Sequence, residues 1–467
     1  SVGQWRGVWP HQLITMSADS DSFGEEYDAG ADDIRFLEDT SEETIGVADS
    51  EEFLSILEGK ELPSPVLEKP ESLANDFRTV LNVIKANSGS GVLSLPYGFL
   101  MGGLVASPIL LLIVGTFSVY CSILLVQCRN RLRDKQANSY GLITREVYGL
   151  PGIIFVEFFL LLTQVGVCVA FVVFIASNLA NILGYFPFEI YCLLLFIPCW
   201  LLSCIRTWRM LAPISAAASL CTLSGVLLIA VYDMYLIYDR RGIAEPIEAV
   251  SISTMFIFIG IAVYTFEGIA LVLPIENSMK KPSHFNWLFS SVIGAIFLAY
   301  AFFGTLCYAA IGPDIQEVIT LNLPPDSLIG YTIALLLCGS LLGTYPASMF
   351  PTSEITERLI FSAKFWNKSD MHGTFRYWLQ NAWRAALVLL TLVLAAFIGE
   401  QFGVLVSLIG SMGSAVLSFV LPCALHLKLF WKETSPPLKI MHAALCLVGC
   451  LVSIFGTIYS VYTIFFK

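Results

Sequence analysis

Two short stretches of this chain interrupt apolar segments with groups that can bind a charged ligand. In the first, Ser88-Gly89-Ser90-Gly91 separates the apolar runs 77–87 and 92–103. Glycine and serine are poor helix formers, so a helix is expected to unwind here. Unwound backbone exposes N–H groups, and the following half-helix presents the positive end of its dipole. We therefore predict a carboxylate site at Asn87, Ser88, Gly89, Ser90 and Gly91; the alternative is that these small residues only permit close helix packing.

The second interruption, residues 264–268, lies inside the apolar segment 252–279. Its freed carbonyl groups are expected to bind an ammonium group, together with carbonyls of the first break. Glu267 is the ionisable residue of this break, and a charge within an apolar segment marks a candidate functional group. Two roles fit it equally: binding and releasing a proton during a cycle, or statically capping broken-helix N–H groups. The residues expected to supply the carbonyl groups are Val263, Tyr264, Thr265 and Phe266.

Other polar residues in apolar segments extend this candidate site. Gln164 lies near the middle of segment 153–183 and is assigned to the ligand site. Glu157 is the second candidate for proton coupling, although its place near one end of that segment favours pairing with a cationic loop residue. Ser340 and Thr344 are candidates for a sodium site, against the commoner reading that their hydroxyls bond to their own helix.

Composition identifies the elements that must position these groups. Hydrophobic residues form 56% of the 467-residue chain and charged residues 13%, and the mean hydropathy is +0.73. We predict an all-α integral membrane protein in a lipid bilayer, because eleven apolar stretches are long enough to span one. These stretches are 77–103, 105–128, 153–183, 188–205, 211–238, 252–279, 285–312, 328–357, 382–399, 402–428 and 439–464.

The two interruptions occupy corresponding places in two sets of five spans. Each lies about thirteen residues, or roughly 20 Å of helix, into the first span of its set. The first set covers about 77–238 and the second about 252–428, with an extra span at 439–464. Because the two sets start in opposite directions, the pattern predicts a 5+5 inverted repeat with broken helices 1 and 6, a leucine-transporter-like fold.

Charge is distributed unevenly along the chain. Residues 1–76 contain 19 acidic and four basic residues, which predicts a largely disordered tail. If odd-numbered spans run outward, 17 Lys and Arg residues fall in loops on one side and three on the other. The positive-inside rule then places the tail in the cytosol and the C-terminus in the lumen or outside the cell. A cytosolic sorting or regulatory partner is a hypothesis for the tail.

Three motifs stand in order along the chain: Lys85 to Tyr97, Phe266 to Met279, and Thr344-Tyr345-Pro346 followed by Phe350-Pro351. They resemble motifs of the amino acid/auxin permease family, in its proton-coupled and vacuolar amino acid transporter branch. The resemblance covers about residues 75–465 and implies amino acid transport, often linked to protons. One position departs from it: the animal proton-coupled branch has a histidine where this chain has Asn82, so a proton role for that position is not carried over.

These observations predict a secondary-active transporter of neutral amino acids that works by alternating access. We expect proton coupling, with sodium as the alternative ion, and no cofactor, metal or nucleic-acid partner. An enzyme is not expected, since no nucleotide-binding loop or catalytic triad pattern stands out. The alternative function is an amino acid sensor that signals through its tail. The expected location is a vacuolar or lysosomal membrane or the plasma membrane.

Overall fold

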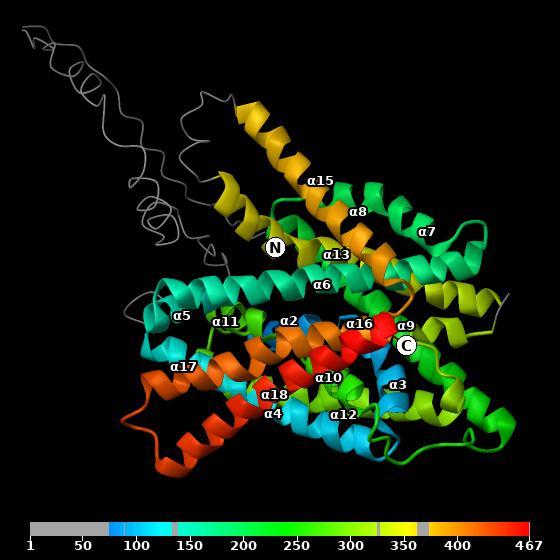
Figure 1. The fold of residues 1–467 in the computed structure, drawn as a ribbon, viewed down its shortest axis with the longest axis horizontal. Coiled ribbons are helices and arrows are strands. Elements are labelled where there is room, and N and C mark those ends of the chain that lie inside the picture. Colours follow the sequence, from blue (N-terminus) through cyan, green and yellow to red (C-terminus); the bar gives the residue numbers. More distant parts are fainter. Residues whose placement is uncertain (1–73, 88, 133–138, 325–326, 362–372, 467) are drawn as a thin grey trace, which may run out of the picture. The chain divides into compact units, whose positions relative to one another are not determined.

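Every regular element of the described chain is a helix (Figure 1). The computed structural model describes residues 74–87, 89–132, 139–324, 327–361 and 373–466. The acidic tail, predicted for 1–76, falls almost wholly outside these residues. Within them, nine helical segments are long and apolar enough to cross a membrane. The prediction of an all-α membrane protein is therefore confirmed.

Most predicted spans correspond to one long helix, since an apolar stretch can satisfy its backbone in lipid only by forming one. A further short helix that we did not predict, α5 (Tyr140–Tyr148), follows α4. Ser139 caps its N-terminus, and the Ser139 hydroxyl accepts a hydrogen bond from the Leu142 N–H. The long helices are α4 (Ala106–Arg131), α6 (Leu150–Leu183), α9 (Trp208–Arg240), α12 (Phe285–Ile311), α13 (Leu328–Phe361), α15 (Gly373–Ile398) and α18 (Pro436–Phe466).

The first and sixth predicted spans are each two helices. The first consists of α2 (Asp76–Asn87) and α3 (Gly91–Gly102), and the sixth of α10 (Met255–Thr265) and α11 (Ile269–Ser278). Both breaks fall where glycine and serine or glycine and glutamate were expected to end the helix. The fourth predicted span is also divided, into α7 (Phe188–Leu194) and α8 (Phe196–Ser203).

The tenth span departs from regular α-helical geometry at its centre. It begins as α16 (Phe402–Ile409), passes through π-helical turns at Gly410–Ser414 and Val416–Val420, and ends as α17 (Leu421–Leu429). The first of these turns contains two glycines, Gly410 and Gly413, and two serines, Ser411 and Ser414. Such turns shift the register of side chains and occur often at functional sites.

Burial separates central helices from peripheral ones. For each span, burial is compared over its most apolar 18 residues. In the tenth span 83% of these residues are buried inside the protein and in the α10–α11 pair 67%, whereas in α9 and α18 the share is 22% each. The outer surface of α9 exposes large apolar side chains, among them Leu220, Leu227 and Val231. An apolar surface of this extent fits a lipid environment rather than water. The broken sixth span and the tenth span therefore form the centre of the protein.

The two ends of the helices differ in charge. We call the basic face the end that carries Arg129, Arg206, Lys280, Lys428 and Lys439, and the opposite face the end formed by residues 241–250, 312–323 and 399–401. Helices α2 and α11 lie on the basic-face side of their breaks, and α3 and α10 on the other side.

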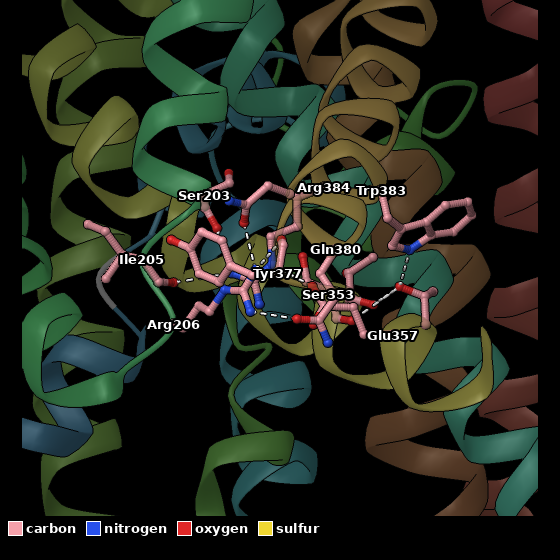
Figure 2. A network of polar contacts seen from close by, with 12 residues as sticks. Ser203, Ile205, Arg206, Ser353, Glu357, Tyr377, Gln380, Trp383 and Arg384 are labelled. Carbon is pink, nitrogen blue, oxygen red and sulfur yellow. Dashed lines mark hydrogen bonds and ion pairs between the residues drawn. The ribbon is translucent and has the colours of Figure 1, made fainter. Parts of the chain in front are cut away.

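A polar network on the basic face joins the end of α8, the end of α13 and the start of α15 (Figure 2). Arg384 is 4% exposed. Its Nε donates to Glu357 Oε1 at 2.5 Å, and its Nη1 to the Ser203 carbonyl at 2.8 Å. Arg206 donates to Gln380 and Asn381, at 2.6 Å each. Because a buried charge needs partners, this network holds the ends of α8 and α13 against the first part of α15.

Replacing Arg384 is expected to destabilise the protein strongly. Arg384→Met leaves Glu357 buried without its cation, which costs about 3–5 kcal/mol. Arg131→Met is the matched control, because the Arg131–Glu433 pair is 52% and 55% exposed and exposed pairs contribute about 1 kcal/mol or less. The measurement is Tm of the purified protein in detergent. Equal Tm values for the two variants would contradict this role.

Candidate functional site

The two helix breaks face each other at short range. A Cβ atom added at Gly91, the first residue of α3, would lie 2.8 Å from the Cα of Thr265, the last residue of α10. The Ser90 and Tyr264 hydroxyls are hydrogen-bonded at 2.6 Å. Only glycine allows this approach of two backbones. The two predicted half-sites are therefore parts of one site.

A cavity of about 390 Å³ lies at the breaks and continues along their basic-face side. Its volume is in the range of small-molecule sites. Its extension toward the basic face is shown by lining residues from α2, α11, the start of α9 and the middle of α13. These residues include Asn82, Lys85, Leu211, Ser215, Ile275, Ala347 and Ser348.

Most of the sequence-predicted ligand residues line this cavity. Val263 and Phe266 do not; both are buried in the core beside it. Ser88 lies outside the described residues. The predicted residues that line the cavity are Asn87, Gly89, Ser90, Gly91, Gln164, Tyr264, Thr265, Glu267 and Thr344.

Glu267 lies at the cavity wall and is held by a residue that sequence reasoning missed. Its Oε2 accepts a hydrogen bond from the Ser414 hydroxyl at 2.5 Å. Ser414 belongs to the first π-helical turn of the tenth span, so the irregular turn and the break of the sixth span meet at this carboxyl. The ion pairs found in the described part of the chain do not include Glu267. A carboxyl that faces a cavity without a fixed cation can bind or release a proton without breaking a salt bridge.

Three of the carbonyl groups at the breaks already have partners, and the first is the Tyr264 carbonyl, which accepts a hydrogen bond from the Glu267 N–H at 3.0 Å. The Asn87 carbonyl accepts a hydrogen bond from the Tyr300 hydroxyl at 2.6 Å, and the Phe266 carbonyl accepts one from Ser118 at 3.2 Å. The expectation that the Tyr264 and Phe266 carbonyls face an ammonium group therefore does not match this arrangement. Buried backbone groups are generally paired, and here α12 and α4 supply the donors for the Asn87 and Phe266 carbonyls.

The two proposed sodium ligands lie in different surroundings. Ser340 is fully buried and bonds to Thr222 and to the Ala218 carbonyl, each at 2.5 Å. It therefore joins α13 to α9 and is not part of the cavity lining. Thr344 lines the cavity, and its hydroxyl bonds back to the Ser340 carbonyl at 2.9 Å. The structure does not bring these two hydroxyls together against α2 or α3.

Glu157, the remaining acidic candidate, forms a contact on the basic face, as does Glu276 near the end of α11. Glu157 makes an ion pair with Arg358 at the end of α13, which matches the expected pairing with a cation. Glu276 pairs with Arg129 at 2.9 Å, and Asn277 accepts a hydrogen bond from the same guanidinium. Backbone hydrogen bonds also tie Ala74 to residues 278 and 280. These contacts connect the residues before α2 to the end of α11, on the side toward which the cavity extends.

The chain is similar in sequence to known membrane transporters. A family model described as transmembrane amino acid transporter protein matches residues 74–466. Amino acid transporter AVT3C of Arabidopsis thaliana is 32% identical over 440 residues, which cover 86% of this chain and 94% of that protein. Vacuolar amino acid transporter 3 of Saccharomyces cerevisiae is 31% identical, over 84% of this chain and 56% of its own length.

A solved structure has the same fold. The Eremococcus coleocola manganese transporter superposes with a TM-score of 0.52 at 10% identity, over 83% of this chain and 87% of that one. At this identity the similarity concerns the fold alone, which is the leucine-transporter-like fold predicted from the paired breaks.

Proposed function

Because the chain belongs to the family of transmembrane amino acid transporters, we propose that it carries neutral amino acids across an intracellular membrane by proton-coupled alternating access. The observation that carries this proposal is the cavity at the two facing helix breaks. Relatives named as vacuolar transporters support a vacuolar or lysosomal membrane, with the plasma membrane as the alternative.

The ends of the broken helices complement the two charges of an amino acid. The N-terminal end of α3, at Ser90 and Gly91, offers backbone N–H groups and a positive dipole end to the α-carboxylate. The C-terminal end of α10 offers its negative dipole end and the Thr265 carbonyl to the α-ammonium. The cavity wall supplies both ends within one site, so a zwitterion is bound without a fixed counter-ion for each charge.

The rest of the cavity favours a neutral substrate side chain. Its wall includes the apolar residues Val167, Phe171 and Leu271. Lys85 and Glu267 are the basic and acidic residues of the wall. Lys85 is engaged with the Ala212 carbonyl at 3.1 Å. An acidic side chain would therefore lack a free cation here, and burying an unpaired charge is costly. A basic side chain would compete with the proton for Glu267.

Glu267 is the group we assign to proton coupling. It faces the cavity and contacts the tenth span through Ser414. A proton bound here changes the charge beside the substrate and the hydrogen bonding between two central spans. Glu157 is the less suitable candidate because it is paired with Arg358.

Orientation follows from the basic face, which we place in the cytosol. The cavity then extends toward the cytosol, and the tail before α2 is cytosolic. In an acidic compartment, protons would drive amino acids from the lumen to the cytosol.

The test is uptake of labelled amino acids into proteoliposomes with and without an imposed pH gradient. We expect neutral amino acids to accumulate, and the gradient to raise their uptake several-fold. Binding without uptake of any amino acid would contradict transport and favour a sensor. Uptake that responds to sodium but not to pH would contradict proton coupling.

A further inference from the structure

A compact loop covers the opposite face between α12 and α13. We call residues 312–323 the gate loop; it contains short 3₁₀ turns at Gly312–Asp314 and Ile319–Asn322. Val318 and Ile319 are each 1% exposed. The second turn packs against α3, α6 and α13, and Thr320 donates a hydrogen bond to Asn178 of α6 at 2.6 Å. The loop therefore closes the end of the protein that lies away from the cavity.

Glu317 fastens the gate loop to two spans of the transport core. Its Oε2 accepts hydrogen bonds from the backbone N–H groups of Gly403 at 2.7 Å and Val404 at 3.2 Å, in the first turn of α16. Tyr97 of α3 also lies beside this carboxyl. One acidic side chain thus lies between the gate loop, the half-helix α3 of the candidate site, and α16. Helix α16 is the first part of the tenth span, whose Ser414 contacts Glu267.

Hydrogen bonding and burial act on this carboxyl in opposite directions. The backbone N–H groups at the start of α16 favour the carboxylate, and burial without a cation favours the neutral acid. Both backbone donors bond to one oxygen, so that oxygen can serve as the carbonyl oxygen of the neutral acid while the other carries a proton. In the described part of the chain, Glu317 has no ion pair with a lysine or arginine. The titratable groups that face it are Tyr97 and, behind Tyr97, Tyr459 of α18; α16 contributes its two backbone N–H groups. Burial without a cation disfavours the ionised form.

We propose that Glu317 is a proton-binding site of the opposite-face gate: it binds a proton when the gate loop closes onto α3 and α16, and releases the proton when the loop opens. The site is separate from Glu267, which lies at the helix breaks. The inference rests on the proposed transport cycle for its role, but its chemistry concerns the loop alone.

The direction of the pH effect follows from the change in burial. In the closed loop, burial raises the pKa of Glu317 to about 7; in an open loop the solvated carboxyl would return toward its ordinary value of 4.5. The closed state therefore binds the proton more tightly, and acid favours closure. Between pH 8.0 and pH 5.5 this difference shifts the closing equilibrium by about 30-fold at most. An acidic lumen would thus hold the gate shut and bias the carrier toward its cytosol-facing state.

Hydrogen–deuterium exchange of the gate loop in lipid nanodiscs tests this proposal. The full-length protein is compared at pH 5.5 and pH 8.0, after correction for the intrinsic pH dependence of exchange. We expect loop amides to exchange several-fold more slowly at pH 5.5, with a midpoint near neutral pH. Glu317→Gln keeps a carbonyl oxygen for both backbone donors and cannot ionise, so at pH 8.0 it should show the protection of the wild type at pH 5.5.

The matched control is Asp314→Asn, which removes an exposed carboxyl from the same loop and should leave the wild-type pH dependence intact. Loop exchange that is independent of pH in the wild type, or faster at pH 5.5, would overturn the proposal, and neither result depends on the folding of a variant. A folded Glu317→Gln protein whose loop exchange depends on pH as in the wild type would also overturn the proposal. Because no transport is measured, this result and the uptake result can fail separately.

Discussion

Glu267→Gln is expected to abolish accumulation of amino acids driven by a pH gradient while leaving exchange across the membrane measurable. Glutamine has the shape of the neutral acid and can still accept the Ser414 hydrogen bond, so the contact between the sixth and tenth spans is kept. It cannot release a proton, so movement of the carrier is no longer linked to the gradient. The measurement is uptake with an imposed pH gradient, beside counterflow of labelled against unlabelled substrate at equal pH.

Glu400→Gln is the matched control, because Glu400 is an exposed acid on the opposite face and its loss should leave both activities unchanged. If Glu267→Gln accumulates substrate under a pH gradient as the wild type does, the carboxyl is a static cap and not a coupling group. If the variant loses both counterflow and accumulation, the result would also count against the assignment, since it would indicate a role in substrate binding or folding.

Gly91→Ala is expected to reduce transport by about 10- to 100-fold. The added Cβ would meet the backbone Cα of Thr265 at 2.8 Å, and backbone atoms cannot move aside as a flexible side chain can. The added methyl group would push the two breaks apart and weaken the hydrogen bond between Ser90 and Tyr264. Overpacking of this kind costs about 1–3 kcal/mol. The measurement is initial uptake rate, normalised to the amount of protein in the membrane.

Gly339→Ala serves as the control for Gly91→Ala. Gly339 lies in α13, and an added Cβ there would meet no atom within 4 Å, so transport should be unchanged. Wild-type uptake by Gly91→Ala would show that the two backbones need not approach this closely for transport.

Much of the fold was readable from local sequence because lipid leaves few alternatives to a helix. The predicted break at 88–91 lies where α2 ends at Asn87 and α3 begins at Gly91, and the break at 264–268 lies between Thr265 and Ile269. Glycine and serine weaken helices by themselves, wherever they stand. Two similar interruptions with opposite directions then implied the inverted repeat.

The partners of the site residues were not predictable in the same way. Ser414 contacts Glu267 across 147 positions of sequence, and Ser118 takes the Phe266 carbonyl across 148. Such pairs depend on how distant helices pack, which periodicity does not encode. The role of Glu317 was equally hidden, since a lone acid in a loop normally indicates only a solvated surface.

The central claim is that one amino acid binds between the two helix breaks, and a cryo-EM map of the protein with a transported amino acid tests it most directly. We predict density with its carboxylate at the N-terminal end of α3, near Ser90 and Gly91, and its ammonium toward the end of α10. Density instead in the separate basic-face cavity lined by Gln127, His426 and Leu438, with the space between the breaks empty, would contradict the claim.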